Sequence, residues 1–164
     1  DEVGPYYVME LLEGSDLSGR SGLPWREIAR YAVEVAQALS VIHARKLVHR
    51  DVSMRNVWRL PTGHVKLIDF GALAPFGVPG QLVGTAPHVA PEALYGRPLD
   101  QRTDLYGLGT ILYWLLTGVH AYPARGLRDL PGLWLSPIPS VSDRRGQPRE
   151  PPVDPAIPSV CGHP

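Results

Sequence analysis

The sequence Val48-His49-Arg50-Asp51-Val52-Ser53-Met54-Arg55-Asn56 places an acid directly after a His-Arg pair and an amide five residues beyond that acid. A second acid follows 13 residues after Asn56, in Asp69-Phe70-Gly71. Groups of this kind can serve phosphoryl transfer: Asp51 would accept a hydroxyl proton, while Asn56 and Asp69 would hold Mg²⁺ against nucleotide phosphates. His-Arg-Asp alone is common in surface turns. The inference of phosphoryl transfer therefore depends on both motifs being present in this order.

The pair of motifs resembles the catalytic loop and metal-binding motif of the eukaryotic-type protein kinases. The resemblance implies an α+β, protein-kinase-like fold with a mostly helical C-terminal lobe. In that lobe a short β-hairpin carries the metal-binding residues. It further implies ATP and Mg²⁺ as cofactors and a protein Ser/Thr hydroxyl as the acceptor.

The first residues resemble the last strand and hinge that join the two kinase lobes. Aromatic and β-branched residues predict a strand over Tyr6-Tyr7-Val8-Met9, before an acidic, turn-rich run. The resemblance places the adenine against Glu10 and Leu12 and the ribose near Asp16. Judged without the resemblance, a plain strand and turn remains open.

A long amphipathic helix is predicted from Pro24 to about Arg45. Proline suits the first helical position because its missing N–H has no partner there anyway. Apolar residues then recur at steps of three and four, which indicates one buried stripe: Ile28, Ala32, Val35, Leu39 and Ile42. We expect His43 to be a packing residue at the helix end.

Two short apolar runs, Val57–Leu60 and Val65–Ile68, flank a turn that contains Pro61 and Gly63. This pattern predicts a β-hairpin. Asn56 and Asp69 would then lie at the two ends of the hairpin, on the same side, as a bridged metal ion requires.

Residues 84–92, Gly-Thr-Ala-Pro-His-Val-Ala-Pro-Glu, resemble the end of a kinase activation segment. The resemblance makes Thr85 the threonine that contacts the catalytic Asp51 and favours Ser/Thr over Tyr substrates. Residues 72–83 read as a loop and contain no Ser, Thr or Tyr. We therefore expect no activating phosphate in the middle of this segment, although Arg50 is present to bind one.

Asp104 begins a second apolar helix, which Gly118 ends. The helix dipole alone favours an acid at that position. The resemblance implies instead that Asp104 holds the backbone of the catalytic loop. We expect five leucines of this helix to face inward: Leu105, Leu108, Leu112, Leu115 and Leu116.

Two positions depart from the kinase pattern. Ser53 stands where Ser/Thr kinases carry a lysine that stabilises the transferring phosphate, so a catalytic hydrogen bond replaces a charge. Trp58 stands where a smaller aliphatic side chain packs beneath the adenine. Its indole would either crowd the nucleotide pocket or turn aside.

The composition mainly excludes certain classes of partner and location. The 164 residues are 44% hydrophobic with a formal charge of zero, which is ordinary for a globular protein and argues against a nucleic-acid or anionic-membrane surface. The only cysteine, Cys161, cannot form an intrachain disulfide, which fits a reducing, cytoplasmic location. The longest apolar run, 105–116, is too short to span a bilayer, and no leader opens the chain.

The domain organisation expected is a last N-lobe strand and hinge (1–17), a partial C-terminal lobe (18–135) and a Pro-rich irregular tail (136–164). A short helix is expected at 125–130. The Gly-rich loop and strand lysine of kinases do not precede Tyr6. We therefore expect a fragment with the N-terminal lobe largely absent, inactive by itself.

Three functions compete on this evidence. The first is a Ser/Thr protein kinase, and the second is a pseudokinase scaffold that binds partners without catalysis. The third, a small-molecule phosphotransferase, is weakened by residues 84–92, which serve protein substrates. Asp51, Asn56 and Asp69 favour the enzyme, because drift after loss of catalysis usually spoils one of them. Oligomeric state is left open.

Overall fold

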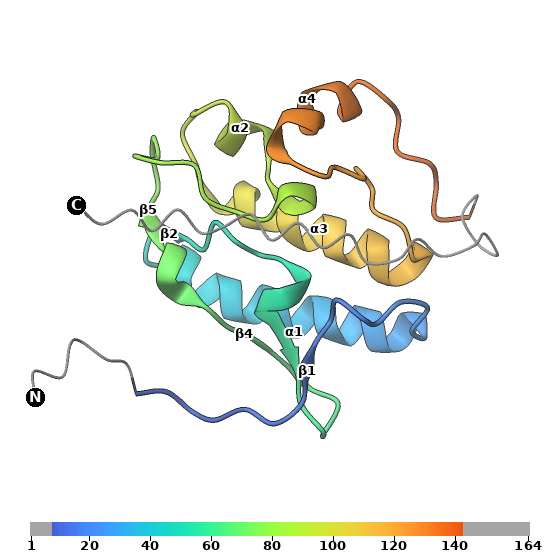
Figure 1. Cartoon of the computed structure of the whole chain (residues 1–164). Coiled ribbons are helices and arrows are strands. Elements are labelled where there is room, and N and C mark those ends of the chain that lie inside the picture. Colours follow the sequence, from blue (N-terminus) through green and yellow to red (C-terminus); the bar gives the residue numbers. More distant parts are fainter. Residues whose placement is uncertain (1–7, 143–164) are drawn as a thin grey trace, which may run out of the picture.

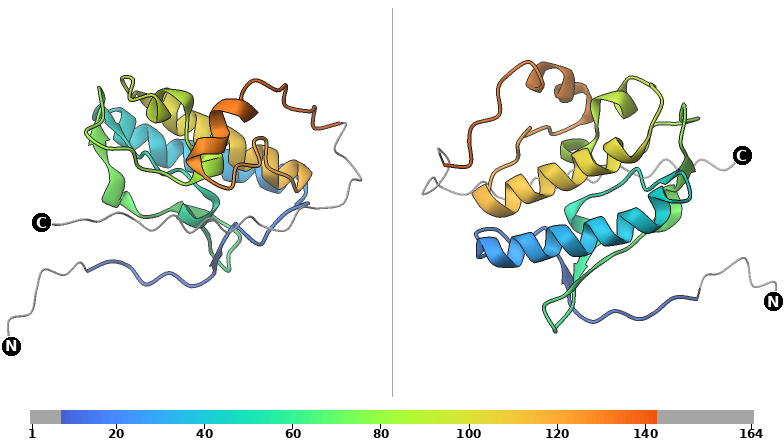
Figure 2. Two further views of the ribbon diagram at one scale, coloured as in Figure 1. Left: turned by 45° about the horizontal axis from the view of Figure 1, so that its top comes forward. Right: turned by 180° about the vertical axis from the view of Figure 1, so that it is seen from behind.

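The computed structural model of the chain describes residues 8–142. Two long helices, α1 (Trp25–His43) and α3 (Gln101–Thr117), lie side by side and form the framework (Figures 1 and 2). A small antiparallel sheet and the catalytic loop cover one side of the pair. Short helices and loops of the last third of the chain lie beyond α3 (Figure 1).

Helix α1 confirms the prediction from Pro24 and the apolar stripe. Its buried residues are Ile28, Tyr31, Val35, Leu39 and Ile42. Tyr31 replaces the predicted Ala32 as a fully buried member, and its ring reaches the side of the helix that faces the sheet. This stripe forms the main core with the inner faces of α3 and the hairpin.

The hairpin consists of β3 (Val57–Arg59) and β4 (Val65–Leu67), and β1 (Ser15–Asp16) pairs with the free edge of β3. Val57 is opposite Leu67, and both are buried. The hairpin is as predicted, except that the strands end one residue earlier, at Arg59 and Leu67. Both bounds are within the usual variation of strand assignment.

The expected strand over 6–9 is not formed in its described part. Val8 and Met9 lie in irregular chain and are 88% and 80% exposed. Residues 8–142 offer them no neighbouring strand, and an unpaired strand lacks the hydrogen bonds that would hold it. Tyr6 and Tyr7 lie outside the described residues.

Helix α3 begins at Gln101, three residues before the predicted start at Asp104, and Asp100 caps it by accepting the N–H of Arg102. Gly118, with a φ of 76°, caps its other end as predicted. Its inner face includes Leu108, Ile111, Trp114 and Leu115. The expectation for Leu105 and Leu116 is wrong, because they are 47% and 37% exposed. They lie on the opposite face, where the described part of the chain has no covering element.

The segment expected as a loop at 72–83 contains a short strand, β5 (Ala74–Pro75), which pairs with β2 (Leu47–Val48). Further along, Gly77 and Leu99 exchange backbone hydrogen bonds of 2.7 and 3.0 Å. A second apolar cluster, which includes Val48, Val89 and Leu130, continues under this region.

Six short helices complete the described chain, those labelled η being 3₁₀ helices: η1 (Met54–Asn56), η2 (Phe70–Ala72), η3 (Ala86–His88), α2 (Pro91–Leu94), η4 (Leu127–Asp129) and α4 (Leu130–Leu133). The last two confirm the helix predicted near 125–130. This helical stretch ends at Leu133, three residues later than predicted. Residues 136–140 are irregular, as predicted. The tail from residue 143, including Cys161, lies outside the described residues.

Candidate active site

The catalytic loop is held by Asp104 at the start of α3. Its Oδ2 accepts the backbone N–H of His49 and its Oδ1 that of Arg50, both at 2.9 Å. Asp104 is only 1% exposed, so these charge-assisted bonds are shielded from water. The role expected for Asp104 is therefore confirmed.

His43, at the end of α1, completes this anchor, since its Nε2 lies 2.7 Å from Asp104 Oδ2. The predicted packing residue is thus also a polar partner. Arg50 has a φ of 70°, a left-handed conformation that is uncommon for any residue other than glycine. The two bonds to Asp104 hold the loop in that conformation and orient the next residue, Asp51.

The other side of the catalytic loop is fixed because its backbone packs closely against helix α3. A Cβ added at Gly107 of α3 would lie 2.7 Å from the carbonyl oxygen of Val52. Only glycine leaves room for the loop to pack directly on the helix. Sequence reasoning missed this residue, although a glycine within an apolar helix is a signal of close approach.

The Asp51 carboxylate is fixed from two directions. Its Oδ1 accepts both the N–H and the hydroxyl of Thr85, at 3.0 and 2.9 Å. Its Oδ2 accepts the side-chain amide of Asn56 at 2.9 Å. The structure therefore brings together Asp51, Asn56 and Thr85, which are spread over 34 residues of sequence.

Asn56 and Asp69 lie where the hairpin begins and ends. Ile68 donates its N–H to the carbonyl of Asn56 at 2.8 Å, which ties the two ends together. Asn56 uses its amide nitrogen on Asp51, which leaves its amide oxygen as a ligand. Asp69 has a φ of 61° and its Oδ1 accepts the N–H of Gly71, which leaves Oδ2.

These oxygen donors fit Mg²⁺, which is commonly held by one or two carboxylates and completes its shell with phosphate oxygens and water. Within residues 8–142 no group of three or more His, Cys, Asp or Glu side chains is arranged to hold a metal by itself. A metal at Asn56 and Asp69 would therefore need the nucleotide as a further ligand.

Proteins of known family with similar sequences identify the family of this chain. A sequence model of the protein kinase domain matches residues 2–130. The chain belongs to the protein kinase family. The Ser/Thr kinase Pkn1 of Myxococcus xanthus is 41% identical over 135 residues, which are 75% of this chain and 20% of that protein. The Ser/Thr kinase PknA of Mycobacterium tuberculosis is 35% identical over 130 residues, 74% of this chain and 30% of that protein.

A solved structure has the same kinase fold. The PK-1 kinase of the Cydia pomonella granulovirus superposes with a TM-score of 0.72 at 19% identity, over 80% of this chain and 54% of that one. The fold predicted from the sequence is thus confirmed. The chain spans about a fifth to a third of the length of the curated relatives named above.

The segment predicted as the hinge runs along the outer face of the hairpin, the face opposite α1. Trp58 donates its indole N–H to the carbonyl of Glu13 at 3.2 Å, and Lys66 pairs with the exposed carboxylate of Glu10. The indole of Trp58 is therefore tied to the hinge and does not point into the core. Within residues 8–142 the backbone groups of Glu10 and Leu12 make no hydrogen bonds.

The structure also describes the contacts of two more predicted site residues, Asp16 and Ser53. Asp16 accepts the N–H and hydroxyl of Ser18 on its Oδ1, at 2.9 and 2.6 Å, so a turn orients its carboxylate. Ser53 is 1% exposed, and its Oγ has no hydrogen-bond partner among the described residues. In this arrangement its hydroxyl is not presented at the surface beside Asp51, so the catalytic role remains a prediction.

Glu92, which ends the activation segment, accepts the hydroxyl of Thr103 from α3 at 2.8 Å. The pair joins the end of the segment to the helix that anchors the catalytic loop.

Proposed function

We propose that this chain forms the catalytic part of a protein Ser/Thr kinase, which transfers the γ-phosphoryl group of ATP to a protein hydroxyl. The observation that carries the proposal is the Asp51 carboxylate, held between the amide of Asn56 and the hydroxyl of Thr85. A carboxylate fixed in this way can accept a proton from an incoming hydroxyl.

In this proposal Asn56 and Asp69 hold Mg²⁺ against the ATP phosphates. The metal would neutralise phosphate charge as the group is transferred. Glu10 and Leu12 would bind adenine through their backbone, Asp16 the ribose, and Trp58 would line the adenine side. Ser53 would donate a hydrogen bond to the phosphate if its side chain rotates toward it.

Thr85 supports a Ser/Thr acceptor, because its contact with Asp51 is the one that the family resemblance associates with such substrates. We place the reaction in the cytoplasm, where ATP is available and Cys161 would stay reduced. Within residues 8–142 no helix has the length and apolar character needed to cross a membrane. The chain keeps Asp51, Asn56 and Asp69, and this gives no support to the scaffold alternative.

The test uses the full-length protein that contains these residues, with a generic protein substrate and radiolabelled ATP. Phosphoserine or phosphothreonine should form in a Mg²⁺-dependent way, and Asp51→Asn should abolish it. Mg²⁺-dependent ATP binding without any transfer would favour the scaffold instead. Phosphorylation of a small molecule but no protein would favour the third function.

A further inference from the structure

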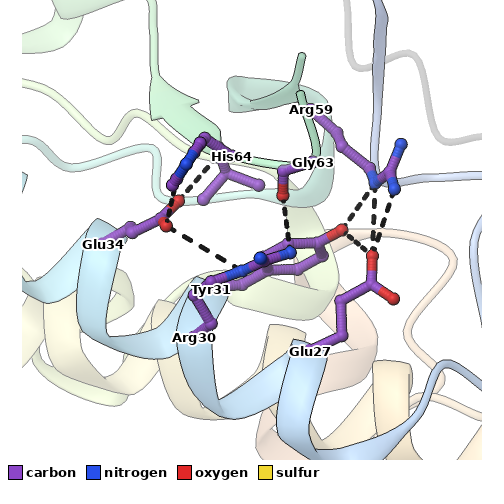
Figure 3. Close-up of polar contacts among 8 residues, drawn as sticks. Glu27, Arg30, Tyr31, Glu34, Arg59, Gly63 and His64 are labelled. Atoms are coloured by element: carbon purple, nitrogen blue, oxygen red, sulfur yellow. Dashed lines mark hydrogen bonds and ion pairs between the residues drawn. The ribbon is translucent and has the colours of Figure 1, made fainter. Parts of the chain in front are cut away.

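Helix α1 carries a polar stripe beside its buried one. Glu27, Arg30, Tyr31 and Glu34 are spaced three, one and three residues apart, so they share one side of the helix. Figure 3 shows all four pointing at the hairpin. Together with Arg59, Gly63, His64 and Val65 of the hairpin, they are called the hairpin clamp below.

At the end of β3 the clamp is centred on the hydroxyl of Tyr31. Arg59 donates its Nε–H to this hydroxyl at 2.6 Å, and Tyr31 in turn donates to Glu27 (Figure 3). Arg59 also reaches Glu27 at 3.3 Å. The bond to Tyr31 and the charge of Arg59 lower the pKa of Glu27, so the carboxylate stays ionised.

At the tip the clamp holds the turn itself. Arg30 donates to the carbonyl of Gly63 at 2.9 Å, and Glu34 accepts the backbone N–H of Val65 at 2.7 Å. His64 lies 2.7 Å from the other oxygen of Glu34 (Figure 3). Two of these bonds are to backbone groups, so they fix the path of the chain.

The clamp and the catalytic loop share α1 as a common support. The end of α1 carries His43, which binds Asp104 and through it the loop that presents Asp51. The first half of α1 holds the hairpin, whose two ends present Asn56 and Asp69. The position of the metal ligands relative to Asp51 therefore depends on how the hairpin sits on this helix.

We propose that the hairpin clamp is a positioning device for the Mg²⁺ ligands, with Tyr31 and Arg59 as its central residues. The inference rests on the proposed function. Neither residue touches the metal or substrate. They set the angle at which the hairpin packs against α1. Most clamp groups are partly exposed to solvent, so their contribution to overall stability is small. Their effect falls instead on ligand placement.

The experiment measures ATP affinity of the full-length protein twice, with excess Mg²⁺ and with EDTA, by calorimetry. The variants are Tyr31→Phe, which removes only the hydroxyl, and Arg59→Met. The second removes the guanidinium but keeps an unbranched apolar side chain at this partly buried position. The control is Tyr113→Phe, whose hydroxyl donates to the carbonyl of Pro139 far from the hairpin. Melting temperatures and turnover at saturating Mg²⁺ are recorded beside each titration.

We expect both clamp variants to raise the Kd for ATP in Mg²⁺ by up to about tenfold, the low end for outer-shell partners of metal ligands. The Kd in EDTA and the turnover at saturating Mg²⁺ should change less than about twofold, and Tyr113→Phe should match the wild type.

Folded variants with an unchanged Kd in Mg²⁺ would overturn the proposal, and so would an equal rise in Mg²⁺ and EDTA. A wild-type protein without Mg²⁺-dependent ATP binding would overturn the proposed function as well.

Discussion

Asp51 and Asp69 carry the same carboxylate but have different neighbours. Both oxygens of Asp51 accept hydrogen bonds, from Thr85 and from Asn56, whereas within residues 8–142 Asp69 accepts one, from Gly71, on Oδ1 alone. In the full-length protein Asp51→Asn should lower turnover by at least about 100-fold, because an amide cannot accept the hydroxyl proton. Asp69→Asn should mainly weaken Mg²⁺-ATP binding, since it removes the metal-facing charge.

Turnover and nucleotide affinity measured on both variants check this division of roles. The amide of Asp51→Asn would meet a donor on either side, so a modest loss of affinity is compatible with the assignment. Equal losses of affinity in both variants, with no selective loss of turnover at Asp51, would contradict it.

Trp58 is the second prediction at the scale of one residue. Because its indole is bonded to the hinge carbonyl of Glu13, we expect Trp58→Leu to change ATP affinity by several-fold and the melting temperature only slightly. Trp25→Leu, 61% exposed on α1, is the control and should change neither. A lower melting temperature with unchanged affinity would show that the ring acts through packing.

At the scale of elements, the activation segment is held without a phosphate. Arg50 donates to the carbonyls of Ala72 and Gln81, one near each end of the stretch that lacks Ser, Thr and Tyr. Burial lowers the pKa of this guanidinium. Backbone pairing of β5 with β2 adds further order.

We therefore expect phosphatase treatment of the full-length protein to leave its activity unchanged within about twofold, since no phosphate is needed to satisfy Arg50. Mass spectrometry before and after treatment locates any phosphate in residues 72–92. A phosphate on Thr85 whose removal abolished activity would contradict this prediction, because Thr85 is bonded to Asp51.

At the scale of the whole molecule, two buried histidines make stability depend on pH. Burial, with His120 nearby, lowers the pKa of His88 to about 3, and burial lowers that of His120 to about 4. Their rings lie 6.0 Å apart beneath the end of the activation segment, and His88 is bonded to Thr110. His88 belongs to η3, the 3₁₀ helix Ala86–His88, and its bond to Thr110 joins η3 to α3.

The unfolded chain binds protons at these histidines near the ordinary pKa of about 6.5, whereas the folded chain does not. Their contribution to stability is therefore complete above about pH 6.5. It falls as the pH drops toward 4, by roughly 1.4 kcal/mol per pH unit for each histidine.

Urea unfolding at pH 7 and pH 5 measures this slope. His120→Phe should remove about half of the part due to the pair, at little cost at pH 7, because both ring nitrogens of His120 lack partners among the described residues. The same pH slope in the variant and the wild type would contradict the assignment.

The sequence by itself predicted the chemistry and determined most of the local elements. The spacing of Asp51, Asn56 and Asp69 indicated phosphoryl transfer, and apolar periodicity located α1 and the hairpin. These features depend on residues close in sequence, where backbone preference and side-chain spacing are enough. It could not determine which leucines of α3 are buried, because that helix is apolar on all sides and only its neighbours choose the inner face.

Tertiary structure alone decided the contacts between distant segments. It brought Arg50 to the carbonyls of Ala72 and Gln81, and it buried the hydroxyl of Ser53. The hairpin clamp joins Tyr31 to Arg59 across 28 residues. Hydrogen bonds of this kind depend on the relative position of packed elements to within a fraction of an ångström, which no local pattern in the chain encodes.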